Sequence, residues 1–467
     1  MMMDRTLTTN LPRRAQAGIS QKLRALVTTP STLVILYFLA HFVLAWLILQ
    51  FNWVATIQVA VVSLCGLWWA FINPRLDRLA MVGSYIIGAE ALWRMSQASP
   101  FWEFGKYSLI GLFALALIKT GRLRGPLLAF LFFGCLLPSI VLPMANSSMS
   151  ALRDNLSFYL SGPLALTVST WFFSHARLKS ETLQKVYYSL LGPAITLAAI
   201  TLFSILMAEN LRFSNNSNMV TSGGFGPNQV STTLGLGILF AFLAYHHPQV
   251  KPVLKAALLV VMLFLTVQSA LTFSRSGLYL ASGGIVLAAF FLIRDRRYFA
   301  QMAFGIGVLL LAINFLLLPQ LEKFTGGLLA ERFTNTRLTN RDRIAEEDLQ
   351  AFSEHPIFGV GPGQTRYFRQ NVSKKYAAHT EFSRLLAEHG IFGLVAIFIL
   401  FAMGAQHYRQ KRTLTGKALA ASMISWSLLF MLVSAMRLAA PSFAFGLSAA
   451  TVVPDPEEEG HPRPSYS

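Results

Sequence analysis

Charged residues are scarce in this chain. They make up 13% of its 467 positions, about half the share typical of soluble domains, which excludes an ordinary soluble fold. Apolar and polar residues do not alternate strictly along the apolar runs, as they would in the strands of a membrane β-barrel. The sequence also has no visible internal repeat, so a repeat architecture has no support.

Cysteines and closely paired aspartates are equally scarce. The two cysteines, Cys65 and Cys135, both fall in apolar runs, and we expect small buried thiols rather than a disulfide or a metal site. No Asp-x-Asp pattern occurs, and the acidic cluster at 346–348 is expected on the wet side of an amphipathic helix. We therefore expect no metal ion and no other cofactor.

Long apolar runs are what the chain has in abundance. Hydrophobic residues make up 54% of it, and runs near the length of a membrane span recur from Leu33 to Arg437. They predict an all-α polytopic membrane protein with about 12 (range about 12–14) transmembrane helices. The predicted spans are 33–51, 54–73, 79–97, 107–118, 126–145, 158–174, 187–208, 230–246, 254–272, 278–293, 299–318, 391–407 and 418–437, with a short last one at 438–453.

The net charge of +18 suggests a nucleic-acid ligand, but the location of the charge argues against one. Residues 1–32 are rich in Arg and Lys, which favours a cytoplasmic N-terminus. With that orientation the inside loops hold 22 of the 39 Lys and Arg residues but 4 of the 21 Asp and Glu residues, and the rest of the chain holds 17 of each. The positive excess is then cytoplasmic, as the positive-inside rule predicts for a protein whose surroundings are membrane lipids.

Most of the outside loops are short, but two stand out. One is 209–229, and the other, 319–390, is far longer than a connection requires. We expect 1–32 to be a cytoplasmic segment and 33–318 a transmembrane bundle that includes the loop 209–229. Residues 319–390 are expected to form a large periplasmic loop domain that folds as a helical lid, 391–453 the C-terminal transmembrane helices, and the Pro-rich acidic 454–467 a disordered tail.

The lid ends in a polar stretch, "AAHTEFSRLLAEHG" (377–390), directly before an apolar run. Helical spacing places His379 on an apolar stripe that faces the bundle. Glu381, Arg384 and Glu388 fall on the opposite stripe, where they are expected to pair with one another on a solvated face. His389 lies at the expected helix end, where a cationic group favours the helix dipole, so a structural role is expected there.

Composition alone would favour a buried structural histidine at position 379, but two arginines support a chemical role for it. Arg275, in "LTFSRSG", and Arg212, in the loop 209–229, are both predicted on the outer side, where basic residues are rare. A lone outer arginine is usually a membrane anchor. However, guanidinium groups bind phosphate oxygens well, and the glycine-rich turns "GGFGPNQ" and "FGVGPGQ" are suited to cradling anions. Together with His379 these residues fit an anionic lipid held at the outer leaflet.

The segment "NRDRIAEEDLQAFSEHPIFGVGPGQ", followed by "HTEFSRLLAEHGIFGLVAIF", resembles the signature region of the O-antigen ligase and polymerase superfamily. "FSRSG" and the loop with "GGFGPN" also resemble family elements, so the resemblance covers about 273–396 closely. One departure is Thr380, where many members have Asn or Ser, and Thr keeps the hydroxyl. The matching positions are Arg341, Pro356, Gly359, Gly361, Gly363, His379, Glu388, Gly390 and Gly393.

The resemblance implies a GT-C-like glycosyltransferase in the bacterial inner membrane, with its site facing the periplasm. It would take glycan from undecaprenyl pyrophosphate. An O-antigen ligase, which transfers O-antigen to a sugar of lipid A-core, is favoured over an O-antigen polymerase or a protein O-oligosaccharyltransferase of the same superfamily.

The chemistry expected for such a transfer assigns roles to particular residues. Arg212 and Arg275 would bind the pyrophosphate and neutralise charge on the leaving group, and His379 would accept the proton of the acceptor hydroxyl. By resemblance the displacement is a single inverting step. Further candidates for contacts are Arg341, Arg343, Asn228, Gly361, Gly363 and Thr380, with Arg437 a weaker one.

A lipid-linked glycan transporter is the alternative from another class. Its main support is Glu90 and Arg94, spaced i,i+4 within a predicted span, because ionisable groups inside a membrane often mark transport pathways. The same spacing fits an ion pair within one helix near its outer end, and a folded outside lid with a histidine is unnecessary for transport.

Overall fold

The computed structural model confirms the predicted class. The chain is 77% helical with almost no strand, and it is a multi-pass membrane protein. The residues that the structure describes are 29–142, 148–247, 249–294, 296–335, 341–369 and 378–453. The predicted cytoplasmic segment before residue 29 and the predicted disordered tail lie outside these ranges.

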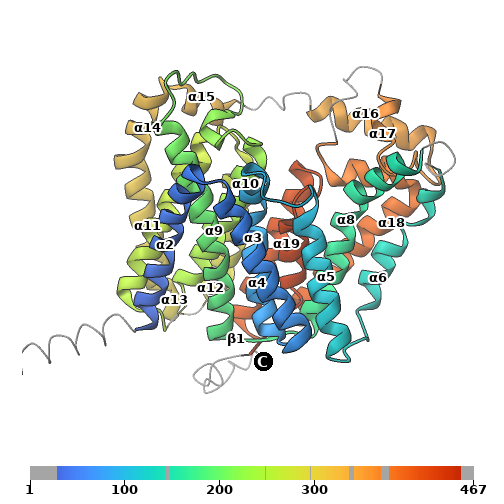
Figure 1. Cartoon of the computed structure of the whole chain (residues 1–467), viewed down its shortest axis with the longest axis horizontal. Coiled ribbons are helices and arrows are strands. Elements are labelled where there is room, and N and C mark those ends of the chain that lie inside the picture. The colour runs from blue at the N-terminus through green and yellow to red at the C-terminus, as the bar shows by residue number, and fades with distance from the viewer. Residues whose placement is uncertain are drawn as a thin grey trace, which may run out of the picture.

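The helices follow one another with short connections (Figure 1). In chain order they are α2 (Pro30–Gln50), α3 (Trp53–Leu67), α4 (Leu76–Met95), α5 (Phe104–Lys119), α6 (Leu127–Gly134), α8 (Met149–Ser174), α9 (Ser180–Leu206), α10 (Pro227–Tyr245), α11 (Pro252–Leu271), α12 (Ser276–Leu292), α13 (Arg296–Leu311), α14 (Leu318–Thr325), α15 (Leu328–Thr334), α16 (Arg341–Glu354), α17 (Thr365–Phe368), α18 (Glu381–Arg409), α19 (Leu414–Val433) and α20 (Ala440–Leu447). Two short strands, β1 (Arg177–Lys179) and β2 (Thr451–Val453), complete the fold.

Nine helices within the described residues are long and apolar enough to cross a membrane, and two shorter apolar helices, Leu127–Ile140 and Ser276–Leu292, accompany them. α13 and α14 form one such span, Tyr298–Thr325, through a π-helical turn. α18 joins the predicted histidine helix to the next predicted span, with a kink at Gly390 (φ 60°, ψ −137°). The C-terminal stretch predicted as a short last span contains the eight-residue helix α20 and strand β2.

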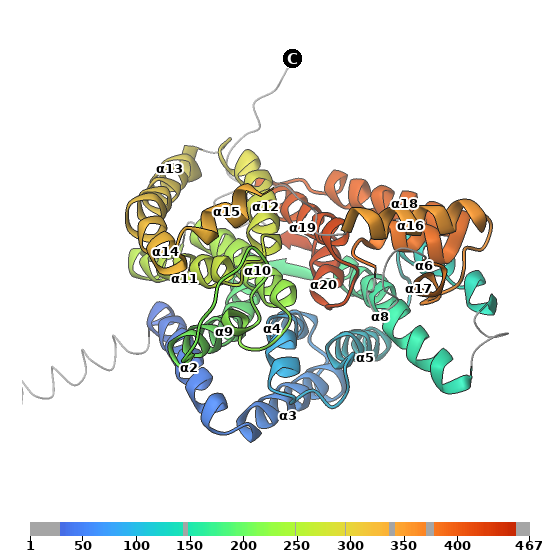
Figure 2. The same ribbon diagram turned by 90° about the horizontal axis from the view of Figure 1, so that it is seen from above.

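The bundle has buried central helices and a lipid-facing rim (Figure 2). In α10, 89% of the most apolar window is buried, whereas the corresponding share is 22% in α2 and 11% in Tyr298–Thr325. Small residues allow the close central packing: a Cβ on Gly235 of α10 would lie 2.2 Å from the carbonyl oxygen of Gly277 in α12. Cys65, on the rim, is exposed and Cys135 is half-buried, so the expected burial of both thiols is wrong, although both are free of a disulfide.

The two ends of the bundle differ. At one end β1 pairs in parallel with β2, with Leu178 opposite Val452, and closes the α8–α9 connection against the segment after α20. At the opposite end lie α15, α16 and α17 (Figure 1). The long loop is therefore helical, as predicted, and its helices cover the end of the bundle at which the site residues lie.

α16 packs on α18 through a different face from the one predicted. Hydrophobic spacing predicts a buried stripe of Ile344, Ala345, Leu349 and Phe352. The buried residues are instead Ile344, Asp348 and Ala351, and Leu349 is 48% exposed. Asp348 is not on the wet side of the helix, because Arg369 (2.8 Å) and the hydroxyl of Ser383 (2.9 Å) bind its carboxylate. A buried ionic pair thus sets the rotation of the helix.

The predicted orientation can be tested by labelling. In a background with Cys65 and Cys135 replaced by alanine, we expect Glu354→Cys to react with a membrane-impermeant maleimide from the periplasmic side. Arg122→Cys should react only after the membrane is opened. Both positions are exposed, so protection of position 354 together with labelling of position 122 in sealed cells would reverse the topology.

Candidate functional site

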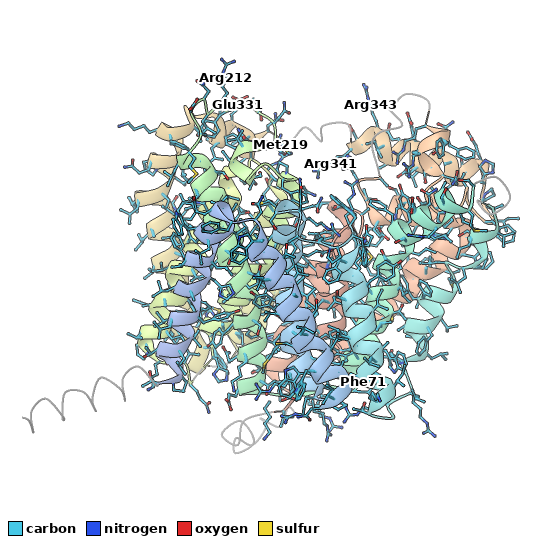
Figure 3. All side chains as sticks on the ribbon, viewed as in Figure 1. Phe71, Arg212, Met219, Glu331, Arg341 and Arg343 are labelled. Atoms are coloured by element: carbon cyan, nitrogen blue, oxygen red, sulfur yellow. The ribbon has the colours of Figure 1, made fainter. Side chains whose placement is uncertain are left out.

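Five arginines and one histidine gather at the end of the bundle that the long loop covers. We call Arg275, Arg332, Arg341, Arg369, Arg437 and His379 the cationic cluster. Burial lowers the pKa of the Arg341 guanidinium, and the charges of Arg275, Arg332 and Arg437 lower it further. Figure 3 shows Arg341 at the same end as Arg212 and Arg343, and Phe71 at the opposite end. The six residues come from six separate places in the chain, which only the fold brings together.

The turn that carries Arg275 is held from two sides. The side-chain oxygen of Asn228, at the start of α10, accepts hydrogen bonds from Ser274 (3.2 Å) and Ser276 (2.5 Å). Phe273 adopts a positive φ of 57°, a strained conformation of the kind found at functional sites. Arg332 Nε donates to the Phe273 carbonyl oxygen at 3.0 Å. Asn228 is thus a positioning residue for the arginine turn.

Backbone carbonyl oxygens bind three of the other arginines, while Arg369 forms an ion pair with Asp348. Arg275 donates to the carbonyl oxygen of Asn335. Arg341 donates to the carbonyl of Val433 (3.4 Å), and Arg437 to that of Ala378 (2.9 Å). A carbonyl carries no net charge, so these bonds orient the guanidinium groups without neutralising them. Like charges held close together favour an anionic ligand between them.

His379 lies beside these arginines, but not on a helix. α18 begins at Glu381, and Thr380 is its N-cap: the Thr380 hydroxyl accepts a hydrogen bond from the Ser383 amide at 2.9 Å. The prediction that His379 occupies an apolar helical stripe is therefore wrong, because Thr380 caps the start of the helix and His379 precedes that cap. The histidine is half-buried in the segment that leads into the helix, next to Ala378, whose carbonyl binds Arg437.

The surroundings of His379 favour its neutral form. Burial lowers the pKa of the imidazole to about 4, and the charges of Arg341, Arg437 and Arg369 act in the same direction. With the lowered pKa the ring is unprotonated at neutral pH and has a free lone pair to accept a proton.

Glu381, Arg384 and Glu388 pair with one another as predicted, but their face is not solvated. All three are about 1% exposed. Arg384 binds the Glu381 carboxylate and also Glu388, at 2.6 Å, while Glu381 accepts the Met436 backbone amide at 3.0 Å. The segment after α19 covers these side chains, an arrangement that sequence spacing could not reveal. The ion pairs therefore anchor the backbone next to Arg437.

A second buried charge network holds the same segment from the other side. Arg94 and Glu90 form the predicted i,i+4 ion pair, at 2.6 Å. Arg94 also donates to the Arg437 carbonyl (2.9 Å), and Glu90 accepts the Ala439 amide (2.7 Å). Lys106 donates to the Met436 carbonyl at 3.1 Å. Charges from α4, α5 and α18 thus fix the backbone of residues 436–439, from which Arg437 reaches the segment beside His379.

The glycine turn "FGVGPGQ" uses its amides within the protein, and the Gly363 N–H binds the Glu388 carboxylate. Val360 and Gly361 donate their backbone N–H groups to the Ala387 and Glu388 carbonyls at 2.9 and 3.0 Å. Gly363 has a positive φ of 75°, and a Cβ there would lie 2.7 Å from the Tyr159 ring. Gly361 and Gly363 therefore let the turn dock on α18 and α8, and the expected anion cradle is replaced by a packing contact.

Three of the residues considered in the sequence lie apart from the cationic cluster. Arg212 and Arg343 are exposed, and Figure 3 shows both side chains at the outer edge. His389 is fully buried, and its Nδ1 lies 2.5 Å from the Ser139 hydroxyl, which fits the structural role predicted for it. The structure adds Arg332 and Arg369, which sequence analysis missed. Both lie in the long outer loop, which holds several other basic residues, so no sequence signal singled them out.

The arrangement has the parts needed for transfer from a phosphate leaving group: fixed guanidinium groups and a neutral proton acceptor. Among the described residues, no three His, Cys, Asp or Glu side chains converge as metal ligands. Residues 257–398 match the family model described as O-antigen ligase. That range includes Arg275, Arg332, Arg341, Arg369 and His379. No curated protein matches the chain.

Proposed function

On the basis of the family match at residues 257–398, we propose that the chain is an O-antigen ligase. It transfers O-antigen polysaccharide from undecaprenyl pyrophosphate to a sugar hydroxyl of lipid A-core, in lipopolysaccharide biosynthesis. The inner membrane holds the bundle, and the cationic cluster faces the periplasm. The observation that carries the proposal is the neutral His379 beside Arg341 and Arg437, whose guanidinium groups donate to backbone carbonyl oxygens.

The cationic cluster binds the pyrophosphate of the donor. Arg275 and Arg332 approach from the α12 and α15 side, and Arg341 from the start of α16. Charge grows on the pyrophosphate as its bond to the sugar breaks, so preorganised guanidinium groups stabilise the transition state more than the ground state. Arg212 remains a donor-binding candidate from the loop 209–229, outside this cluster.

His379 acts as the general base. The acceptor hydroxyl oxygen attacks the anomeric carbon of the donor sugar from the face opposite the pyrophosphate, which inverts the configuration. The new C–O bond forms as the old one to phosphate breaks, undecaprenyl pyrophosphate leaves, and the hydroxyl proton passes to the imidazole. Thr380 contributes indirectly, because it caps α18 and so fixes the residue that precedes it.

Donor binding strengthens this base. The nearby arginine charges disfavour the protonated ring in the unliganded protein. A bound pyrophosphate offsets those charges, which raises the pKa of His379 toward the range that suits proton transfer at neutral pH. The imidazole therefore becomes a good proton acceptor when the donor is in place.

The transporter alternative loses its main support. Glu90 and Arg94 are buried, paired with each other and bonded to the backbone of residues 436–439. They hold part of the candidate site in place, so their presence in a membrane helix does not require a transport pathway.

A competition between acceptors tests the proposal. Purified protein in detergent is given lipid-linked O-antigen together with lipid A-core, lipid-linked repeat units and an acceptor protein. We expect glycan on lipid A-core and release of undecaprenyl pyrophosphate, without a sealed membrane. Elongated lipid-linked glycan would assign the polymerase reaction instead, and glycosylated protein the oligosaccharyltransferase reaction. Turnover that needs sealed vesicles would favour transport.

A further inference from the structure

A large groove lies between α5 and α8, outside the cationic cluster. It encloses about 1000 Å³. One wall is the start of α5 with the residues before it, and the other is the first half of α8. Three aromatic side chains at its mouth are partly exposed: Phe101 (51%), Trp102 (49%) and Tyr107 (38%). Neither the mechanism above nor the family match uses this groove.

The groove contains buried polar atoms without hydrogen-bond partners. Ser161 is 2% exposed and Glu103 is 4% exposed, and both line the groove. Among the described residues, no hydrogen bond reaches the Ser161 hydroxyl or Oε1 of Glu103. Glu103 has an ion-pair partner in Lys106 at 2.5 Å, so its charge is balanced while an oxygen remains available. Buried polar atoms of this kind are costly unless a ligand satisfies them.

The composition of the groove indicates the class of ligand. Leu152, Leu156 and Leu160 recur every four residues along the α8 wall, with Ser157 and Ser161 beside them. Sugars have apolar C–H faces and a rim of hydroxyls. Aromatic rings and leucine side chains cover such faces, and carboxylate and hydroxyl oxygens bind the rim.

The groove adjoins a small cleft of about 10 Å³ near the segment before α18. Phe158 lines both this groove and a small cleft formed with Tyr159, Ala378 and Arg437. Ala378 precedes His379, so the cleft lies beside the segment that carries the histidine. Arg275 and Arg332 belong to α12 and α15, on the other side of the bundle from α5 and α8 (Figure 2). The groove and these two arginines therefore lie on opposite sides of the bundle.

We propose that the α5–α8 groove is a carbohydrate subsite that binds the core sugars of the acceptor. Identifying the sugars as those of the acceptor rests on the proposed function; the carbohydrate class rests on the groove itself. An acceptor held there presents its hydroxyl to His379 while the donor pyrophosphate occupies the arginine side, which gives the two substrates separate approaches to one base.

Binding of a soluble sugar tests this subsite without the donor. The probe is core oligosaccharide freed of lipid A, titrated into the purified full-length protein by calorimetry. Leu156→Trp, which fills the groove, is expected to weaken binding at least about tenfold, equivalent to about 1.4 kcal/mol. Leu64→Trp, on the lipid-facing side of α3 (66% exposed), is the matched control and should bind like the wild type. Tyr107→Ala, at an exposed position, provides a milder second variant that should also weaken binding.

Each outcome has one meaning. Unchanged oligosaccharide binding in both groove variants, or no binding by the wild type, overturns the subsite. Weaker binding of undecaprenyl pyrophosphate in Leu156→Trp, with oligosaccharide binding unchanged, overturns it too and assigns the groove to the polyprenyl chain. If the wild type binds the oligosaccharide through the groove but transfers nothing to lipid A-core, the subsite stands and the ligase proposal fails. If Leu156→Trp transfers glycan to lipid A-core with an unaltered KM for lipid A-core, the ligase proposal stands and the acceptor subsite fails.

Discussion

Replacing His379 with alanine is expected to lower the rate of glycan transfer by about 10²–10⁴-fold, the usual cost of losing a general base. The imidazole is neutral at pH 7 because burial and the charges of Arg341, Arg437 and Arg369 lower its pKa to about 4. The variant should still insert, fold and bind lipid-linked donor, since His379 precedes α18 and is not its cap. The measurement is single-turnover transfer with saturating donor, together with donor binding.

His389→Ala is the matched control for this variant. His389 is fully buried against Ser139, so its loss should lower the melting temperature and leave the transfer rate of the folded fraction close to that of the wild type. The pH profile adds a second readout: the acidic limb of kcat/KM, where protonation removes the base, should disappear in His379→Ala. Near-normal turnover in well-folded His379→Ala, or wild-type turnover abolished by EDTA, would refute the mechanism while leaving the family assignment intact.

Arg275→Ala is expected to lower kcat/KM about 10- to 100-fold, because it removes charge-assisted contacts to the pyrophosphate worth about 1.5–3 kcal/mol. Arg275→Lys should recover only part of this loss, since an ammonium group lacks the planar fork of a guanidinium. Transfer kinetics with varied donor concentration measure both effects. A structural anchor would tolerate lysine fully, so complete rescue by lysine would argue against a phosphate contact.

Two exposed arginines on the same end of the bundle serve as comparisons for Arg275. Arg343→Ala should change kcat/KM little, because Arg343 is exposed on α16 and lies at the outer edge (Figure 3). Arg212→Ala tests the other donor-binding candidate. A loss as large as that of Arg275→Ala would mean that the loop 209–229 moves onto the donor when it binds. An effect as small as that of Arg343→Ala would restrict the phosphate site to the cationic cluster.

Sequence patterns identified single residues of the site better than their surroundings. The rarity of basic residues in the short outer loops singled out Arg275, whereas Arg332 lies among other basic residues of the long loop. In contrast, helical spacing placed His379 on a helix, whereas the Thr380 cap begins the helix just after it. Spacing also placed Glu381, Arg384 and Glu388 on a wet face, because it describes one helix alone and cannot register that the segment around Met436 covers that face.

The sequence by itself determined that this protein is a helical membrane protein with its polar mass in one long loop. Long apolar runs and the distribution of charge are local features of the sequence. In a bilayer they determine the membrane spans and their orientation. Only the tertiary structure decided which charges meet. Arg94 and Lys106 bind backbone carbonyls 343 and 330 residues away, and Glu381 binds the Met436 amide 55 residues away. Those contacts depend on how helices distant in the chain pack together. Local sequence patterns do not show which helices will become neighbours.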